Sequence, residues 1–189
     1  MKYRIYKIVR FICRPLLQLL FRVEVSGKEN IPSKGSVILA GNHTSNRDAY
    51  IMICIPDRIV HTLAKKELFN TKFKNVFFRS MACIPVDRSI HDNNAKNEAI
   101  NVLNNGHVIG IFPEGTVNKS KDELLPFKYG AVSFASKTDS YIVPFAITGK
   151  YKLFRKSVKV KYGKPYKVKN DLDKENEILR NKILDLKGR

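Results

Sequence analysis

The chain contains few cysteines, and their number and placement argue against disulfide-stabilised folds and cysteine-dependent enzymes. Cys13, Cys54 and Cys83 are odd in number, lie in apolar surroundings and form no CxxC pair. We therefore expect reduced cysteines in a reducing compartment rather than a disulfide framework. None of the three lies beside a histidine in the sequence, which argues against a cysteine nucleophile.

Several short signatures of catalysis and cofactor binding are also missing. The chain has no GxGxxG fingerprint, no GxxxxGK[ST] phosphate loop, no HExxH zinc motif and no GxSxG nucleophile elbow. Three of its histidines, His61, His91 and His107, lack metal-ligand spacing with carboxylates or cysteines. The sequence therefore predicts neither a metal requirement nor a resident cofactor.

Acidic residues are scarce relative to basic ones. Lys and Arg number 35 against 17 Asp and Glu, and the resulting formal net charge of +18 is spread along the whole chain. Such an excess predicts an anionic partner, which could be nucleic acid, an anionic bilayer or a phosphorylated substrate. A length of 189 residues with 43% hydrophobic residues suits one globular domain with a proper core.

Residues 1–22 have a pattern of their own. Apolar residues recur at helical spacing, namely Ile5, Ile8, Val9, Ile12, Leu16, Leu19 and Leu20. The polar residues of the opposite face are Lys7, Arg10, Arg14 and Gln18. The longest uncharged run of the segment, residues 15–21, is far too short to span a bilayer. The segment also lacks a small-residue cleavage site, which argues against a secretory signal peptide.

A basic helix with an apolar face is suited to lying in the membrane interface. We therefore predict that residues 1–22 form a membrane-associating amphipathic segment, kinked or divided at Pro15. The alternative is an ordinary amphipathic helix docked on the core.

The rest of the chain, residues 23–189, alternates between apolar runs and helical patterns. We predict strands at residues 37–40, 59–64, 83–86, 108–112 and 142–147, and helices near residues 47–54, 67–79, 93–104 and 129–137. Val158 and Val160 suggest a late edge strand, and Leu179, Ile183 and Leu186 suggest a terminal helix. The alternation predicts an α/β domain with a mostly parallel central sheet flanked by helices.

A histidine and an aspartate follow the first of these strands. His43 comes just after the strand and Gly41, and Asp48 lies at the start of the next predicted helix. A carboxylate placed there can hold one imidazole nitrogen and leave the other free to accept a proton near neutral pH. Taken alone, the pair is weak evidence for a catalytic base, because a turn histidine and a helix-capping aspartate give the same pattern.

Two cationic residues follow other strands, and ligands of parallel sheets bind beyond the carboxyl ends of strands. Arg88 follows the strand at 83–86 and offers a fork of donors that matches phosphate. A surface ion pair with Asp87 is the alternative. Lys65 follows the strand at 59–64, where it could hold a phosphate as a point charge or be an ordinary solvated lysine.

The loop after the strand at 108–112 carries a third group of candidates. Glu114 and Thr116 can hydrogen-bond hydroxyl groups, and Gly115 permits close approach of the backbone to a ligand. An ordinary turn explains the same residues.

Together these segments resemble the glycerophospholipid acyltransferases, specifically the 1-acylglycerol-3-phosphate O-acyltransferases. The resemblance covers roughly residues 23–165, and its blocks occur in the family's order: Asn42-His43-Thr44-Ser45-Asn46-Arg47-Asp48 (the HxxxxD block), Ala64-Lys65-Lys66-Glu67-Leu68-Phe69, Ile84-Pro85-Val86-Asp87-Arg88, Phe112-Pro113-Glu114-Gly115-Thr116 (the EGT block), Pro126-Phe127-Lys128-Tyr129-Gly130-Ala131 and Ile142-Val143-Pro144-Phe145. Val117 and Asn118 depart from the Arg-Ser that often follows EGT, so an anionic contact is lost or moves to Lys119 or Lys121.

The resemblance implies transfer of a fatty acyl group from a thioester to the sn-2 hydroxyl of 1-acylglycerol 3-phosphate, which gives phosphatidic acid in phospholipid biosynthesis. The thioester is acyl-CoA or acyl carrier protein (acyl-ACP), each a co-substrate rather than a cofactor. His43 would be the general base, oriented by Asp48. Arg88, with Lys65, would bind the acceptor phosphate.

The EGT block has implied roles of its own. Glu114, Gly115 and Thr116 would position the glycerol or the thioester, and backbone N–H groups near the last two would meet the developing oxyanion.

The expected partners are an anionic membrane surface, a lysophospholipid, and acyl-CoA or acyl carrier protein, without nucleic acid. The expected location is the cytoplasmic face of the cell membrane, as a peripheral, monotopic protein. The nearest alternative is the same chemistry on glycerol 3-phosphate, another lysophospholipid or an aminoacyl lipid. Two further alternatives are a basic nucleic-acid-binding domain, against which the chain has no recognised motif, and a catalytically silent peripheral membrane protein.

Overall fold

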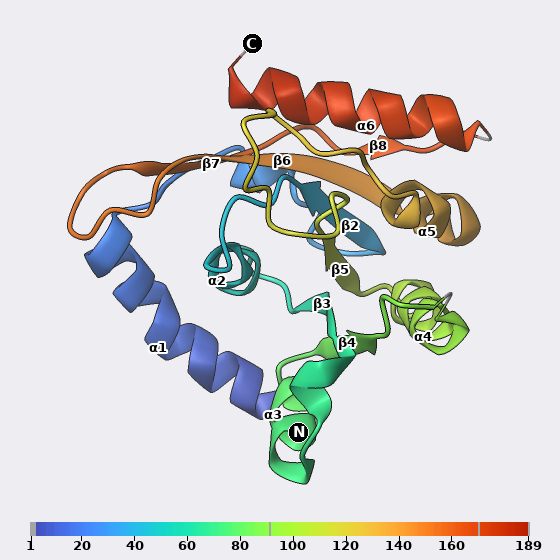
Figure 1. Cartoon of the computed structure of the whole chain (residues 1–189), viewed down its shortest axis with the longest axis horizontal. Coiled ribbons are helices and arrows are strands. Elements are labelled where there is room, and N and C mark those ends of the chain that lie inside the picture. Colours follow the sequence, from blue (N-terminus) through green and yellow to red (C-terminus); the bar gives the residue numbers. More distant parts are fainter. Residues whose placement is uncertain (1–2, 91, 170, 189) are drawn as a thin grey trace.

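The computed structural model describes residues 3–90, 92–169 and 171–188, and its centre is a twisted sheet with helices on both faces (Figure 1). Within these residues eight strands form the order β1-β7-β6-β2-β5-β3-β4, with β8 paired to β6. The strands are β1 Glu24–Ser26, β2 Val37–Gly41, β3 Val60–Lys65, β4 Cys83–Val86, β5 Val108–Ile111, β6 Tyr141–Gly149, β7 Val158–Tyr162 and β8 Tyr166–Lys167. All pairs are parallel except β6–β7 and β6–β8. The predicted mostly parallel sheet is confirmed.

The helices are α1 Arg4–Phe21, α2 Asp48–Cys54, α3 Lys72–Ser80, α4 Asn93–Asn104, α5 Gly130–Thr138 and α6 Leu172–Lys187, with short 3-10 turns η1 Lys28–Asn30 and η2 Lys66–Phe69. They lie between or beside the strands as the alternating pattern predicted. His91, one of the histidines considered for metal binding, lies outside the described residues.

Side chains of β2 point alternately to the two faces of the sheet, and both faces are covered. Ile38 and Ala40 pack in a core with residues of α4, α5 and α6. Val37 and Leu39 pack on the other face with residues of α1 and α2. A strand covered on both faces reads as one continuous apolar run, which is why β2 was easy to predict.

The strand β2 lies in the middle of the parallel part of the sheet, between β5 and β6. The chain leaves it through α2 toward β3, which lies on the β5 side, whereas β6 lies on the other side. Connections that diverge in this way leave a crevice at the carboxyl end of the strand, where ligands of open α/β sheets bind. His43 lies just past that end of β2.

One predicted helix and one predicted helix break differ from the structure. The helix expected at 67–79 is divided into η2 and α3, because Thr71 is extended and its hydroxyl accepts from the Lys74 N–H as the cap of a new helix. Of the kink or division expected at Pro15, the division is absent, since α1 runs unbroken through it. Tyr6 and Leu17, on either side of Pro15, are both buried.

Candidate functional site

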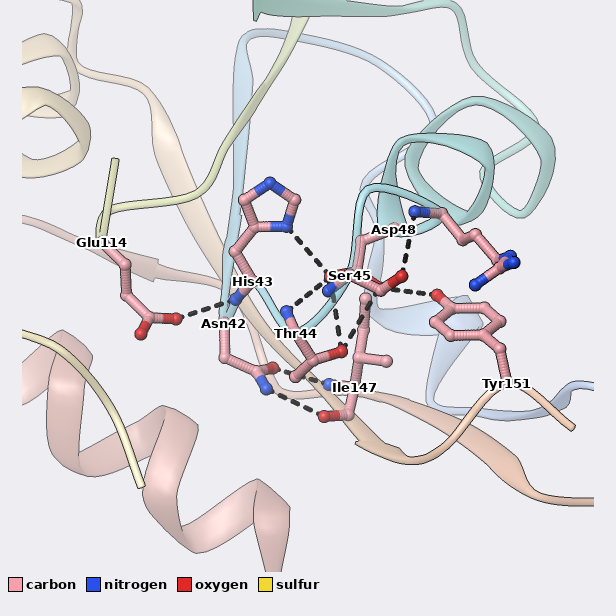
Figure 2. A network of polar contacts seen from close by, with 9 residues as sticks. Asn42, His43, Thr44, Ser45, Asp48, Glu114, Ile147 and Tyr151 are labelled. Atoms are coloured by element: carbon pink, nitrogen blue, oxygen red, sulfur yellow. Dashed lines mark hydrogen bonds and ion pairs between the residues drawn. The ribbon is translucent and has the colours of Figure 1, made fainter. Parts of the chain in front are cut away.

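His43 and Asp48 meet at the carboxyl end of β2 (Figure 2). The distance from His43 Nδ1 to Asp48 Oδ2 is 3.0 Å, and the Asp48 side chain is completely buried while that of His43 is 17% exposed. A carboxylate on Nδ1 fixes the proton there and leaves Nε2 as the nitrogen that can accept one. The pair that the sequence predicted is therefore brought together in the orientation a general base needs.

The Asp48 carboxylate does not cap its own helix. Its Oδ2 accepts from the backbone N–H groups of Thr44 and Ser45 at 2.6 and 2.8 Å, which belong to the loop before α2. Its Oδ1 accepts from the Tyr151 hydroxyl at 2.6 Å. These donors satisfy the buried carboxylate and fix its position.

The ring and backbone of His43 are held separately. The imidazole stacks on the Phe112 ring at 4.1 Å between centroids, with the planes 9° apart. The His43 N–H donates to Glu114 Oε1 at 2.8 Å, and its carbonyl accepts from the Asn118 N–H at 2.7 Å. The loops after β2 and β5 therefore fix the histidine from both sides.

Glu114 is placed differently from a residue that binds substrate hydroxyls. It is buried, and its second oxygen, Oε2, accepts from the Leu125 N–H at 2.8 Å. Both carboxylate oxygens are thus occupied by backbone donors. This geometry favours a positioning role, in which Glu114 joins the His43 loop to residues 114–125, over the substrate contact that the sequence predicted.

Arg88 and Gly115 lie in contact. Arg88 Nη1 donates to the Gly115 carbonyl at 2.6 Å, which brings the end of β4 to the EGT loop after β5, across the intervening strand β3. Gly115 has a φ of +71°, and a Cβ there would come within 3.0 Å of Lys128 Cε. Only glycine fits this position easily, and Lys128 joins Arg88 as a second cation beside it.

Three other groups predicted to contact the substrates are the Gly115 N–H, Thr116 and Lys65. The Gly115 N–H donates to the Phe112 carbonyl at 2.9 Å, so it is not free for an oxyanion. Thr116 is exposed on the same loop, and Lys65 is exposed at the carboxyl end of β3, where it pairs in register with Val86. Neither side chain makes a hydrogen bond or ion pair within the described part of the chain.

The alternative for Arg88, an ion pair with Asp87, is not formed among the described residues. Asp87 instead lies 3.6 Å from Lys66 Nζ. Hydrogen bonds from the Ser89 hydroxyl and N–H lower the pKa of the Asp87 carboxyl. Arg88 therefore keeps most of its donors for a ligand.

Two residues of the site make contacts that no sequence pattern indicated. Tyr151 lies 103 positions from Asp48 along the chain. Asn42 is buried, and its amide exchanges two hydrogen bonds with the Ile147 backbone at 2.7 and 2.8 Å, which ties the His43 loop to β6. Both contacts depend on how β6 lies beside β2, and that could only be known from the folded chain.

Helix α1 presents its apolar side outward. Arg10 donates to the carbonyls of residues 56–58 at 3.0 to 3.2 Å, and Arg14 lies 3.6 Å from Asp57, so part of its cationic side binds the body of the protein. The exposed apolar residues are Ile5, Ile8, Phe11, Ile12, Leu16 and Leu19. Within the described residues, no helix combines the length and the apolar character needed to cross a bilayer.

The cysteines are free, and two of them are poor nucleophiles. Cys54 and Cys83 are buried. Burial raises the pKa of the Cys54 thiol to about 11 and also raises that of Cys83, so both are protonated at neutral pH. No group of three or more potential metal ligands occurs in residues 3–90, 92–169 and 171–188.

Comparison with known proteins places these features in context. A family model described as Acyltransferase matches residues 22–148. The chain is 37% identical over 139 residues to the 1-acyl-sn-glycerol-3-phosphate acyltransferase of Borreliella burgdorferi, which covers 72% of this chain and 55% of that protein. It is 32% identical over 145 residues to the Bacillus subtilis protein of the same name, covering 76% and 71% respectively. The crystal structure of the 1-acyl-sn-glycerophosphate (LPA) acyltransferase PlsC from Thermotoga maritima superposes with a TM-score of 0.77 and 25% identity, over 100% of this chain and 82% of that one.

Proposed function

The chain belongs to the acyltransferase family, and on that premise we propose that it transfers a fatty acyl group from a thioester to the sn-2 hydroxyl of 1-acylglycerol 3-phosphate. The names of its relatives support the acceptor. The observation that carries the proposal is the His43–Asp48 pair at the same sheet edge as the Arg88–Gly115 contact. A base for a hydroxyl and a cation for a phosphate are the two groups that this acceptor needs.

In the proposed reaction His43 Nε2 removes the proton of the acceptor hydroxyl as its oxygen attacks the thioester carbonyl carbon. Asp48 stabilises the imidazolium that forms. The tetrahedral intermediate then expels the thiolate, which takes the proton back from His43, so that the new ester and a free thiol leave. The substrate supplies the nucleophile, and the protein needs none. Thr116 N–H is the remaining EGT candidate for the oxyanion.

The acceptor phosphate would bind beside Gly115. Arg88 uses one guanidinium nitrogen on the Gly115 carbonyl, and the Lys128 side chain lies beside the same residue. Lys65, at the end of the intervening strand β3, would add positive charge at the same edge. The donor, acyl-CoA or acyl-ACP, would approach the exposed edge of the His43 ring.

Replacing Arg88 by alanine should weaken acceptor binding selectively. We expect the KM for 1-acylglycerol 3-phosphate to rise about tenfold, because charge-assisted hydrogen bonds to phosphate are lost. The KM for the thioester should stay nearly unchanged in steady-state assays that vary one substrate at a time. Lys34→Ala is the matched control, since it removes one exposed positive charge just before β2, at the amino edge of the sheet. Equal increases in both KM values would contradict the clamp.

We also propose that α1 lies in the interface of an anionic bilayer, on the cytoplasmic face of the membrane. Its outward side is apolar, with Phe11 82% and Leu19 62% exposed, and the chain as a whole carries a net charge of +18. An apolar helix face in the headgroup region combined with attraction to anionic lipids is how monotopic helices bind. The C-terminal end of α1 lies beside the loop that carries Asp48, which would bring the site to the lipid surface.

A single charge on that face should release the protein from vesicles. We expect Phe11→Glu to weaken binding to vesicles of phosphatidylglycerol and phosphatidylcholine by about tenfold, because a phenyl group no longer enters the lipid. The melting temperature should not change, since Phe11 is exposed. Ile178→Glu on α6 is the control, because it places the same charge on the helix layer across the sheet. Binding is measured by sedimentation with the vesicles. An equal loss of vesicle binding in both variants would mean that net charge, rather than the α1 face, governs binding.

The first experiment is acyl transfer by the purified protein in detergent micelles. Lysophosphatidic acid and lysophosphatidylcholine are offered as acceptors, each with an acyl-CoA and an acyl-ACP donor. Transfer to lysophosphatidic acid alone supports the proposal and identifies the donor. Transfer to lysophosphatidylcholine, or to neither lipid, overturns the proposed acceptor.

A further inference from the structure

Tyr151 touches the His43–Asp48 pair from a part of the chain that the family match does not include. It lies just after β6, whereas the match ends at residue 148. Its hydroxyl donates to Asp48 Oδ1 at 2.6 Å (Figure 2). The only other donor to that oxygen within the described residues is the Thr44 hydroxyl, at a long 3.4 Å.

The Tyr151 phenol is protonated at neutral pH and donates to Asp48. Burial, followed by the negative charge of Asp48 and the hydrogen bond to it, raises the pKa of Tyr151 well above its ordinary value. The charged or titratable groups around Asp48 are His43 on Nδ1, Tyr151 on Oδ1, Glu114 on the His43 backbone and the nearby Arg47. Besides His43, Tyr151 is thus the side chain with a short hydrogen bond to the buried carboxylate.

The same phenol ring packs against α1. Phe21, the last residue of α1, lies edge-to-face on it at 5.3 Å between centroids and 87° between planes. The Arg47 guanidinium, one residue before Asp48, lies 5.9 Å from the Phe21 ring and 6.0 Å from the Tyr151 ring. One aromatic pair and one cation therefore connect the end of α1 to the start of α2.

The segment that carries Tyr151 is tied to α1 a second time. The Phe154 N–H donates to the Leu20 carbonyl, near the end of α1. Figure 1 shows the β6–β7 connection reaching over the C-terminal end of α1. Any displacement of α1 from the body would act on this connection, and through it on Tyr151.

We propose that Tyr151 is a positioning residue that acts through Asp48, and that its packing on Phe21 couples the seating of α1 to the orientation of the His43–Asp48 pair. The kinetic part of this inference rests on the proposed acyl transfer; the geometric part does not. Without the hydroxyl, Oδ1 loses its short donor, while Oδ2 keeps its backbone donors. The fold should survive, and the carboxylate should lose its single fixed rotation.

The test is Tyr151→Phe in the full chain. We expect kcat for acyl transfer to fall about tenfold, as for the loss of one hydrogen bond to a charged group, with the KM of donor and acceptor unchanged. Nitrogen NMR of the His43 ring should show the Nδ1–H tautomer in the wild type and a mixture of tautomers in the variant. Either an unchanged kcat or unchanged His43 ring signals would overturn the proposal.

Tyr166→Phe is the matched control, because the Tyr166 hydroxyl is buried without a partner in the described part of the chain. It should leave kcat and the His43 signals unchanged; a change equal to that of Tyr151→Phe would overturn the specific role of Tyr151. Should the wild type transfer no acyl group at all, the proposed function fails, and the ring signals still decide the positioning role.

The coupling to α1 is tested separately by Phe21→Ala. We expect the same fall in kcat and the same change in the His43 signals, with vesicle binding retained, and recovery of both in Phe21→Tyr, which restores the edge-to-face contact. A Phe21→Ala protein with wild-type kcat would contradict the coupling between α1 and the His43–Asp48 pair. A fall in kcat explained entirely by lost vesicle binding would do the same.

Discussion

Replacing His43 by alanine should reduce kcat by about three orders of magnitude, because the proposed general base for the acceptor hydroxyl is lost. The fold should remain, since the contacts that join the loops at this position are made by the His43 backbone N–H and carbonyl and not by its ring. Acyl transfer measured at saturating concentrations of both substrates, alongside thermal unfolding, separates the two effects.

The control for this variant is His107→Ala, which removes an exposed imidazole at the amino end of β5, the opposite edge of the sheet. Its activity should equal that of the wild type. A His43→Ala protein that keeps a tenth of wild-type activity would rule out the base role. Loss of activity with a melting temperature lowered by many degrees would mean that the ring stacked on Phe112 is structural.

The central strands were predictable because each is buried on both faces. β2 and β5 consist of buried residues throughout. Such continuous apolar runs can be predicted as strands without knowing which strands they pair with. The edge strand β1 was not foreseen, since it has only three residues and no buried position. The break at Thr71 was missed because a cap inside an apolar, helix-like stretch is decided by local hydrogen bonding.

The site was predictable where residues near in sequence are also near in space. His43 and Asp48 meet because a strand end, a short loop and a helix start follow each other directly. Arg88 and Gly115 meet because parallel strands bring their carboxyl ends to one edge. The contacts of Glu114 were not predictable, since an acidic residue in a loop gives no sign that two backbone N–H groups will donate to it.

The orientation of α1 shows what periodicity alone leaves open. An amphipathic pattern indicates two faces but not which one contacts the protein. In the structure the Arg10 guanidinium binds the carbonyls after α2, and the apolar side remains outward. Those carbonyls belong to residues 56–58, in the turn that follows α2, and the sequence does not indicate that this turn will lie against α1.

Replacing Asp48 by asparagine should reduce kcat by about three orders of magnitude, because in the proposed reaction the His43 imidazolium loses the negative charge that stabilises it. The asparagine oxygen can keep the N–H groups of Thr44 and Ser45, and its amide can donate to the Tyr151 oxygen, so the loop should stay in place. Asp92→Asn is the control, since Asp92 caps α4 with the same kind of backbone hydrogen bond away from His43.

The decisive comparison is the double variant His43→Ala, Asp48→Asn. If Asp48 acts only through His43, the double variant should be no slower than His43→Ala alone, because groups that work as a unit lose their effect together. Single-turnover rates of the wild type, both single variants and the double variant complete the cycle. If the rate reductions of the two single variants multiply in the double variant, Asp48 stabilises the transition state independently of the histidine. We do not expect that result, because the Asp48 carboxylate is buried behind Tyr151 and the Thr44–Ser45 loop.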